Sequence, residues 1–288
     1  MTYRGRFAPS PTGPLHFGSL VAALGSWLCA RHAGGQWLVR VEDIDPPREV
    51  AGAADQILAT LPAFGLLADA PPLFQSQRIA AYDAAFEQLR DNDHLFPCWC
   101  SRRVLVASGG IHRDGRCLTA VDPQRPPAWR LRVPDVEVSF PDALHGPQRE
   151  SLRQRVGDFV IRRAEGFYSY QLACVVDDAF QGISEVVRGT DLLDSTTRQI
   201  WLQRCLGLST PRYRHLPLVQ DQHGRKLSKS TRAWPLDPTD PIPALRRALA
   251  FLQRPFPARA HDVETLLVAA LEGFSPTLLS HCSGHSVD

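Results

Sequence analysis

The chain has 288 residues, of which 44% are hydrophobic and 22% are charged, and its formal net charge is +2. This composition is that of an ordinary globular protein, large enough for one big domain or two smaller ones. No apolar run approaches the roughly 20 residues that span a bilayer, which predicts a cytoplasmic protein without membrane contacts. Seven cysteines, an odd number, favour free thiols or metal ligands over a disulfide framework.

Strands and helices alternate in the first part of the chain. In chain order we predict a strand (residues 5–8), a loop rich in proline, glycine and serine (9–18), a helix opened by a serine cap (19–32), a strand (37–41) and a helix (49–64). This order is a βαβ unit, in which a helix joins two parallel strands. Such units place ligands at the carboxyl ends of the strands, where loops meet helix N-termini.

The composition changes after a further predicted helix at residues 79–90. Residues 98–117 show little periodicity and are rich in cysteine, glycine and arginine, so we interpret them as an insertion. Beyond it we predict strands at 129–133, 159–161 and 215–219, helices at 194–205, 244–252 and 263–271, and a proline-rich linker after Trp234. Regular secondary structure therefore resumes on the far side of the insertion.

The chain contains two lysines, Lys226 and Lys229, and they lie three residues apart in the run KLSKS at 226–230, whereas the other 30 basic residues are arginines. Lysine carries a compact, hydrated charge on a flexible stem and can follow a moving phosphate group, which the rigid planar guanidinium group does less well. The pair therefore predicts a phosphate-binding loop. The alternative is a solvated loop in which two lysines fall together by chance.

A second candidate phosphate site lies in the N-terminal run 9–19, PSPTGPLHFGS. Its glycines let the backbone approach a ligand, His16 can donate to phosphate oxygens, and the N-terminus of the following helix favours an anion. Alone, the run also fits a structural turn around a buried histidine. Together with the lysine loop, it predicts a site that holds the triphosphate of ATP from two sides and stabilises charge during attack at the α-phosphate.

These two runs resemble the HIGH element and the KMSKS loop, the signatures of the class I aminoacyl-tRNA synthetases. Residues 16–19 (HFGS) correspond to the first and 226–230 to the second, while the runs 6–13 (RFAPSPTG), 41–45 (VEDID) and 187–192 (VRGTDL) are similar to the glutamyl branch. Serine replaces histidine at the fourth HIGH position, which removes one phosphate donor. The resemblance extends over residues 5–230. It implies an α/β fold: a Rossmann-type doubly wound parallel sheet with a zinc-containing insertion and a short helical C-terminal tail.

The resemblance also implies a division of the chain and an ATP site. The implied segments are the first half of the catalytic domain (1–93), an insertion with a zinc site and an acceptor-binding region (94–155), the second half with the KLSKS loop (156–234) and a short helical tail (235–288). His16 and Lys229 are the implied catalytic residues. The residues implied to bind ATP, with Mg²⁺, are His16, Gly18, Ser19, Lys226, Ser228 and Lys229.

A glutamate pocket is implied by the same resemblance, built from Arg6, Phe7, Ala8, Pro9, Ser10, Glu42, Tyr170 and Arg188. The residue types fit glutamate independently, because Glu42 can accept from an α-ammonium group and the arginines Arg6 and Arg188 can donate to carboxylates. The hydroxyl of Tyr170 would add orientation. The alternative for Glu42 and Arg188 is an exposed ion pair at strand ends, which contributes little.

Four residues of the insertion suit tetrahedral zinc: Cys98, Cys100, His112 and Cys117. Thiolates and imidazole are zinc ligands, and four protein ligands would make a closed structural site with one Zn²⁺ per chain. Related enzymes carry a Cys-x-Cys pair and a final cysteine, and His112 in the third place is inferred from its position. The alternative is a group of buried thiols beside a solvated histidine.

The position of the KLSKS run suggests which acceptor is used, because it ends 58 residues before Asp288. That length is too short for the large helical anticodon-binding region of a full-length glutamyl-tRNA synthetase. Truncated members of the branch activate glutamate with ATP and Mg²⁺ and esterify it to the queuosine base at the wobble position of tRNA(Asp). The resemblance therefore implies ATP, L-glutamate and queuosine-containing tRNA(Asp) as partners of a monomeric ligase.

Other functions remain open at this point. A compact glutamyl-tRNA synthetase charging tRNA(Glu) or tRNA(Gln) would share the active site, and a catalytically silent paralogue would bind tRNA or a regulatory partner without turnover. A small-molecule nucleotidyltransferase would not account for the glutamate-like pocket. Asp177 and Asp178 are expected to cap a turn or line the acceptor cleft, and His215 to lie in the core or to support a site residue.

Overall fold

The computed structural model describes residues 2–106, 109–219, 236–254, 256 and 260–281. Its strands are β1 (Arg4–Phe7), β2 (Gln36–Val41), β3 (Leu73–Phe74), β4 (Leu95–Cys98), β5 (Ala128–Leu131), β6 (Glu137–Asp142), β7 (Gly146–Ser151), β8 (Phe159–Arg162), β9 (Glu185–Gly189) and β10 (Arg212–Leu216). Its α-helices are α1 (Phe17–His32), α2 (Ala53–Ala63), α3 (Ile79–Asp91), α4 (Leu152–Arg155), α5 (Tyr170–Phe180), α6 (Leu193–Leu206), α7 (Pro241–Phe251) and α8 (Val263–Leu271). None of the described helices is long and apolar enough to cross a membrane.

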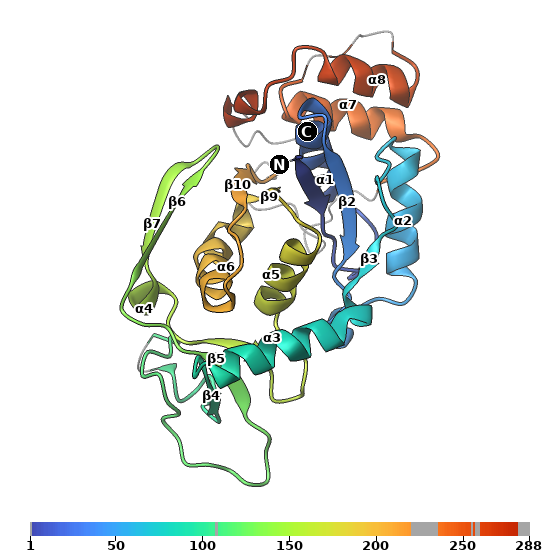
Figure 1. Ribbon diagram of the computed structural model, residues 1–288. Helices are drawn as coiled ribbons and strands as arrows, with labels where there is room; N and C mark the ends of the chain where they lie inside the picture. The colour runs from blue at the N-terminus through green and yellow to red at the C-terminus, as the bar shows by residue number, and fades with distance from the viewer. Residues whose placement is uncertain (1, 107–108, 220–235, 255, 257–259, 282–288) are drawn as a thin grey trace.

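The strands at the centre of the molecule run parallel. One sheet has the order β1-β2-β3, and a second has the order β7-β6-β10-β9, in which β6 and β7 form an antiparallel hairpin and the other pairs are parallel. β1 and β9 adjoin, because the Ser184 N–H donates to the Arg4 carbonyl oxygen at 2.9 Å and the Arg4 N–H donates to Ser184 Oγ at 2.9 Å. The two sheets therefore continue one another (Figure 1).

Helices cover both faces of this sheet, as the alternation of side chains along β2 shows. Trp37 and Val39 enter the hydrophobic core that includes residues of α1, α7 and α8, whereas Leu38 enters the core that includes residues of α3, α5 and α6. Arg40 points in the same direction as Leu38 and reaches Asp178 on α5. The predicted α/β fold with a Rossmann-like parallel sheet is therefore confirmed.

Most predicted elements are present with shifted ends. The helix predicted at 263–271 is α8 and that at 79–90 is α3, one residue longer. The serine cap of the first helix was wrong: α1 begins at Phe17 because the His16 side chain caps it, with Nδ1 accepting from the Ser19 N–H at 3.3 Å. The strand predicted at 215–219 is β10, which begins three residues earlier, at Arg212.

Several elements were not predicted at all. They are the short strands β3 and β4, the hairpin β6–β7, the helices α4 and α5 and the strand β9, most of which are no longer than six residues. The predicted helix at 49–64 begins later, at Ala53, and Val50 is exposed rather than part of its apolar face. The proline-rich linker after Trp234 starts outside the described residues.

The insertion and the C-terminal helices lie at opposite ends of the molecule (Figure 1). β4, β5 and β8 form a separate antiparallel sheet, and the described residues from Trp99 to Pro127, between β4 and β5, form no α-helix or strand. Residues of α7 and α8 pack with α1 in one hydrophobic core. The two parallel sheets therefore lie between the insertion and the helices α7 and α8.

A close backbone approach at Gly35 sets the register of β1 and β2. A Cβ atom there would lie 2.4 Å from the Tyr3 carbonyl oxygen, which accepts the Gln36 N–H at 2.9 Å. Gly35→Ala is expected to lower the free energy of unfolding by about 1–3 kcal/mol, because backbone atoms must move apart. Urea denaturation measures this loss.

The matched control is Gly34→Asn. Gly34 has a φ of +60°, a Cβ atom added there would meet nothing within 4 Å, and asparagine tolerates this left-handed conformation. The control is expected to lose clearly less stability than Gly35→Ala. Equal losses for both variants would contradict the close approach as the cause.

Candidate active site

Two adjoining cavities open at the carboxyl ends of β1, β9 and β10. The larger, about 570 Å³, is lined by the loop after β1, the first turn of α1 and residues 216–219 after β10. The smaller, about 420 Å³, lies between β1, β2, β9 and the start of α5. Both are bordered by Phe7, Ala8, Ser10, Ala22 and Gly189, so that a ligand can extend from one cavity into the other. Parallel α/β sheets place their ligands at this edge.

The structure brings together nearly all of the predicted glutamate-site residues. Lining the smaller cavity are Arg6, Phe7, Ala8, Ser10, Glu42, Tyr170 and Arg188. Pro9 lines the larger cavity instead, and its carbonyl oxygen accepts the Glu42 N–H at 2.9 Å, which ties the loop to the end of β2. The predicted pocket is therefore a single concave site built from segments about 180 residues apart in sequence.

The predicted ATP residues fall into two groups. His16, Gly18 and Ser19 line the larger cavity at the N-terminus of α1, where backbone N–H groups and the helix dipole favour an anion. Lys226, Ser228 and Lys229 lie outside the described residues. The described part of this cavity therefore has the N-terminus of α1 on one side.

Two buried arginines and two buried carboxylates form an ionic cluster at the smaller cavity, in which Arg6 and Glu42 line the cavity and Arg40 and Asp178 contact them. Asp178 Oδ1 accepts from Arg40 Nη1 at 2.7 Å and from Arg6 Nε at 3.1 Å, and Glu42 Oε1 accepts from Arg40 Nη2 at 3.4 Å. Arg40 is fully buried, and Arg6 is 3% exposed. Because these charges balance, the group can remain in the interior without a solvent counter-ion.

The pKa values of the two carboxylates of this cluster are shifted in opposite directions. Burial would raise the pKa of Asp178, but Arg6 and Arg40 outweigh it and lower the pKa to about 2. For Glu42, burial raises the pKa, and the attraction of Arg40 and Arg6 offsets only part of that effect. A nearby cation, such as an ammonium group, would stabilise the charged form of Glu42.

Arg188 projects from β9 on the same side of the sheet as Arg6 and Arg40, and it is held differently. Its guanidinium donates to Tyr170 Oη, Gln199 Oε1, Thr196 Oγ1, the Leu192 carbonyl oxygen and His215 Nε2, at 2.8 to 3.3 Å. All five acceptors are neutral groups when the imidazole is neutral. The group that lines the cavity is therefore a well-ordered cation.

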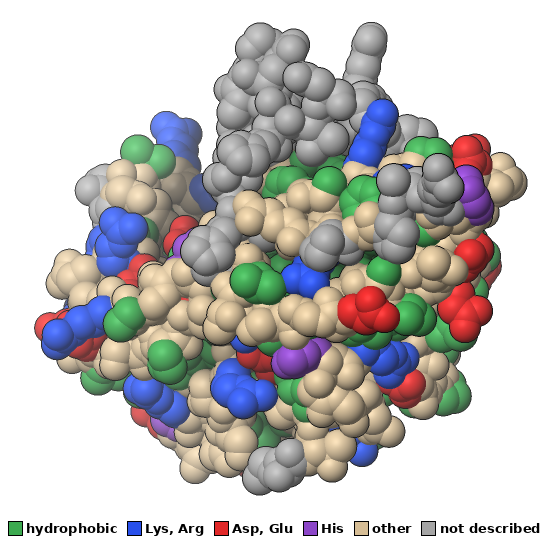
Figure 2. Space-filling model, turned by 90° about the horizontal axis from the view of Figure 1, so that it is seen from above, with side chains coloured by type: hydrophobic (Ala, Val, Ile, Leu, Met, Phe, Trp, Pro, Cys, Tyr) green, Lys and Arg blue, Asp and Glu red, His purple; other side chains and the backbone are tan. Residues whose placement is uncertain are grey.

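Further ionic groups lie at the wall of the smaller cavity. Asp45 accepts from Arg163 Nη1 at 2.9 Å and also pairs with Arg48, and all three residues line the cavity. Burial would raise the pKa of Asp45, but the hydrogen bonds from Arg163 and Arg48 lower it. Basic and acidic side chains are interspersed on the face of the molecule that Figure 2 shows.

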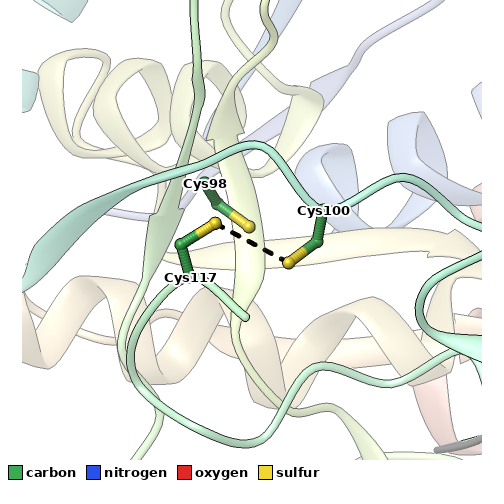
Figure 3. Close-up of side chains that lie close together, drawn as sticks. All are labelled: Cys98, Cys100 and Cys117. Atoms are coloured by element: carbon green, nitrogen blue, oxygen red, sulfur yellow. Dashed lines mark hydrogen bonds between the residues drawn. The ribbon is translucent and has the colours of Figure 1, made fainter. Parts of the chain in front are cut away.

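Three cysteines of the insertion point toward one another (Figure 3). The sulfur atoms of Cys98, Cys100 and Cys117 all lie within 4.8 Å of one another. Backbone N–H groups of Trp99 and Leu118 donate to Cys117 Sγ and Cys100 Sγ at 3.2 and 3.3 Å. Burial opposes ionisation, but hydrogen bonds from Thr119 and the Trp99 backbone lower the pKa of Cys117 to about 6. Three thiolates suit a tetrahedral zinc ion.

His112 is not part of this group, contrary to the predicted ligand set. Its Nδ1 lies 2.8 Å from Asp158 Oδ2, its ring packs 5.4 Å from that of Phe96, and the residue is 1% exposed. The sequence spacing brought His112 near Cys117 along the chain, but the contact with Asp158, 46 residues away, directs the ring elsewhere. Of the predicted ligands, the structure therefore assembles the three cysteines.

Residues that sequence reasoning missed complete the site. Asp177 and Asp178, expected at a turn or an acceptor cleft, are both buried on α5, where Asp177 accepts from Gln75, Arg78 and Tyr82. Arg40 was not predicted, and the signal available was an arginine in the middle of an apolar strand. His215 is fully buried and contacts Arg188, which confirms the prediction that it lies in the core or supports a site residue.

A model of the class I tRNA synthetases for Glu and Gln, catalytic domain, matches residues 2–240 of the chain. The chain therefore belongs to the class I tRNA synthetase family. A glutamate-tRNA synthetase from Elizabethkingia anophelis has a TM-score of 0.80 at 24% identity, covering 100% of this chain and 68% of that one. A glutamate tRNA ligase from Elizabethkingia meningosepticum, in complex with its amino acid, has a TM-score of 0.78 at 25% identity, covering 96% and 65%.

The more similar relatives belong to one group. The glutamyl-Q tRNA(Asp) synthetase of Xanthomonas oryzae pv. oryzae is 58% identical over 282 residues, which cover 96% of this chain and 93% of that protein. The glutamyl-Q tRNA(Asp) synthetase of Burkholderia cenocepacia is 52% identical over 290 residues, covering 95% and 96%. Within the class I family, the chain belongs with these glutamyl-Q tRNA(Asp) synthetases.

Acid should destabilise the protein partly through Asp178. Because its pKa is about 2 in the folded chain and 3.8 is the ordinary value, the stabilisation is complete above about pH 4 and is lost as the pH falls toward 2. Asp178→Asn leaves two buried guanidinium groups with weaker acceptors and is expected to lower the free energy of unfolding at pH 7 by about 3–5 kcal/mol. Its further loss between pH 4 and 2 should be smaller than that of the wild type.

Urea denaturation across this pH range measures both effects. The matched control is Asp93→Asn, which removes an 88% exposed carboxylate paired with Arg132. Such surface pairs contribute little, so this variant should follow the wild type at each pH. An Asp178→Asn protein as stable as the control would refute the role of the carboxylate.

Zinc bound by the three cysteines should be lost when one of them is replaced. Cys117→Ser removes one of the three thiolates, and we expect the purified variant to lose most of the metal that elemental analysis finds in the wild type. The control Cys205→Ser changes a thiol outside the group and should keep it. His112→Ala should also keep the metal. Zinc retention by Cys117→Ser would refute the site.

Proposed function

We propose that the chain activates L-glutamate with ATP and Mg²⁺ and transfers the glutamyl group to the queuosine base at the wobble position of tRNA(Asp). The observation that carries this proposal is the charge pattern of the smaller cavity, beside a cavity with a phosphate-binding helix terminus. The names of relatives 52–58% identical to the chain support the choice of acceptor. The chain is then a ligase that consumes ATP.

Glutamate recognition would use both signs of charge. The buried carboxylate of Glu42 would accept from the α-ammonium group, while Arg6 and Arg188 would donate to carboxylate oxygens and Tyr170 would orient the ligand. Phe7, Ala8 and Ser10 border both cavities, and Pro9 lines only the larger one. In the proposed binding mode, the reacting carboxylate of glutamate would face the larger cavity, which shares these residues.

The activation step would join the two cavities. A carboxylate oxygen of glutamate attacks the α-phosphorus of ATP, the bond to the β-phosphate breaks, and glutamyl-adenylate and pyrophosphate form. His16, Gly18 and Ser19 would hold phosphate oxygens at the N-terminus of α1, and Lys226, Ser228 and Lys229 would do so from the other side. Mg²⁺ bound to ATP supplies further charge neutralisation. We assign His16 and Lys229 to stabilising the charge that develops at the α-phosphate.

In the transfer step, an acceptor hydroxyl must reach the carboxyl carbon that was activated in the first step. A hydroxyl of the queuosine base attacks the carbonyl carbon of glutamyl-adenylate, the bond to AMP breaks, and an ester forms with release of AMP and a proton. Asp45, Arg48 and Arg163 form an ionic wall of the smaller cavity. This wall offers both hydrogen-bond donors and acceptors to an incoming nucleotide. Polar nucleotide groups and phosphates are the ligands that such a wall suits.

The three cysteines of the insertion would hold one structural zinc ion. Zinc would fix the segment between β4 and β5, whose described residues form no α-helix or strand. The fit rests on the mutual approach of three sulfur atoms and on the backbone N–H groups directed at two of them. The metal would lie in the insertion rather than among the residues of the two cavities.

The proposal is tested with labelled glutamate, ATP and total tRNA prepared with or without queuosine. Label should appear on tRNA(Asp) only when queuosine is present, and glutamate-dependent pyrophosphate exchange should proceed without any tRNA. Lys229→Ala should slow this exchange by a factor of about 100 or more, because a charge that stabilises the transition state is lost, with little change in glutamate binding.

The same experiment distinguishes the two alternative functions from the proposed one. Label at the 3′ end of tRNA(Glu), or exchange that requires tRNA, would indicate a compact glutamyl-tRNA synthetase. No exchange and no labelling would indicate a catalytically silent paralogue. An exchange rate unchanged in Lys229→Ala would refute the assigned role of that lysine and leave the acceptor result standing.

A further inference from the structure

A buried chain of three polar residues runs from the hairpin β6–β7 to the smaller cavity, which is the proposed site of the amino acid and is called the amino-acid cavity below. Asp142 Oδ2 lies 2.6 Å from His215 Nδ1, and His215 Nε2 lies 3.0 Å from Arg188 Nε. The three residues are 3%, 0% and 5% exposed, respectively. Only Arg188 among them lines the amino-acid cavity.

The hydrogen-bond partners define the protonation state of the imidazole. The Nε of Arg188 always carries a proton and can only donate, so His215 Nε2 must accept. The imidazole proton of His215 is then on Nδ1, where Asp142 accepts it. Thr196 Oγ1, 3.2 Å from His215 Nε2 and 2.9 Å from Arg188 Nη2, is compatible with this arrangement because a hydroxyl can donate to one and accept from the other.

Electrostatics agrees with a neutral imidazole beside an ionised carboxylate. Burial is the main cause that lowers the pKa of His215, and Arg188 adds to it while Asp142 opposes it. Burial would raise the pKa of Asp142, but hydrogen bonds from His215 and from the backbone N–H groups of His145 and Leu144 lower it to about 2. The Asp142 charge therefore lies one ring away from the Arg188 charge.

Arg188 differs in this respect from the other two arginines of the site. Arg6 and Arg40 share Asp178 directly, at 3.1 and 2.7 Å, whereas no carboxylate of the described residues lies within 4.0 Å of Arg188. The ring of Tyr213 adds an aromatic face 5.6 Å from its Cζ atom, and His215 stacks on the same ring. The Arg188 cation is thus ordered without being neutralised by a direct ion pair.

We propose that Asp142 and His215 are positioning residues for amino-acid binding: Asp142 fixes the imidazole tautomer, and the imidazole accepts from Arg188 and keeps that guanidinium aimed for a substrate carboxylate. A neutral acceptor orders the arginine while leaving its charge for the ligand. A carboxylate in the place of His215 would compete with the substrate for the same cation. This inference rests on the proposed function, in which glutamate is the ligand.

Variants of the pair separate this role from a merely structural one. In His215→Gln the amide oxygen can take the place of Nε2 and accept from Arg188, whereas His215→Asn keeps a donor for Asp142 and loses the acceptor. Asp142→Asn directs an amide donor at Nδ1, which moves the imidazole proton to Nε2 and sets donor against donor at Arg188. Glutamate-dependent pyrophosphate exchange gives KM for glutamate, KM for ATP and kcat of each variant.

We expect His215→Asn and Asp142→Asn to raise KM for glutamate about tenfold or more, with KM for ATP unchanged, since one charge-assisted hydrogen bond that orients Arg188 is lost. His215→Gln should stay within about threefold of the wild type. The matched control is Arg214→Gln. Arg214 directly precedes His215 in β10, faces the other side of the sheet and pairs with Glu185. This control should lower the melting temperature without raising KM for glutamate.

A spectroscopic measurement tests the tautomer without any assay of activity. In the long-range ¹H–¹⁵N spectrum of histidine-labelled protein, His215 should appear as the Nδ1–H tautomer in the wild type and as the Nε2–H tautomer in Asp142→Asn. An Nε2–H tautomer in the wild type overturns the inference whether or not glutamate is the substrate. So does a KM for glutamate that His215→Asn and His215→Gln raise equally. Failure of the proposed function would appear separately, as a wild type with the expected tautomer but no glutamate-dependent exchange.

Discussion

Three arginines on one face of a parallel sheet are the constraint around which the candidate active site is built. Arg6, Arg40 and Arg188 come from β1, β2 and β9 and point toward α5 and α6, where little water can reach them. A buried guanidinium group is always charged, so each must meet acceptors that the fold supplies. Asp178 on α5 meets two of them, and five neutral acceptors meet the third.

The period of two along each strand explains how these charges gather. Leu38 and Arg40 of β2, with Glu42 directly after the strand, share one face, and Trp37 and Val39 share the other. One face of β2 thus packs in a hydrophobic core, and the other carries the ionic cluster beside the cavity. Replacing a buried ionic cluster by apolar side chains often leaves the free energy of unfolding unchanged or raises it. The presence of this cluster is therefore better explained by ligand binding than by stability.

The sequence predicted what neighbouring residues determine and missed what distant contacts determine. The motif runs located Arg6, Glu42 and Arg188, because each lies within a short string at the end of a strand. The partners that organise them were not found, since Asp178 is 172 residues from Arg6 and 138 from Arg40, on a helix that was not predicted. The error over His112 has the same origin, because its spacing to Cys117 was visible and its contact with Asp158 was not.

Buried aspartates, rather than extended regular structure, connect the segments that the sequence separates. An aspartate only accepts hydrogen bonds, has several acceptor positions and loses little side-chain entropy on burial. Asp158 joins His112, Gly115 and Val133, so that it holds the insertion against the strand region after β5. Asp177 joins residues before and within α3, Asp178 joins β1 to β2, and Asp142 joins the hairpin β6–β7 to β10. Two of these carboxylates also hold the arginines of the candidate site, Asp178 directly and Asp142 through His215. The geometry of the smaller cavity is therefore a consequence of how distant segments are joined.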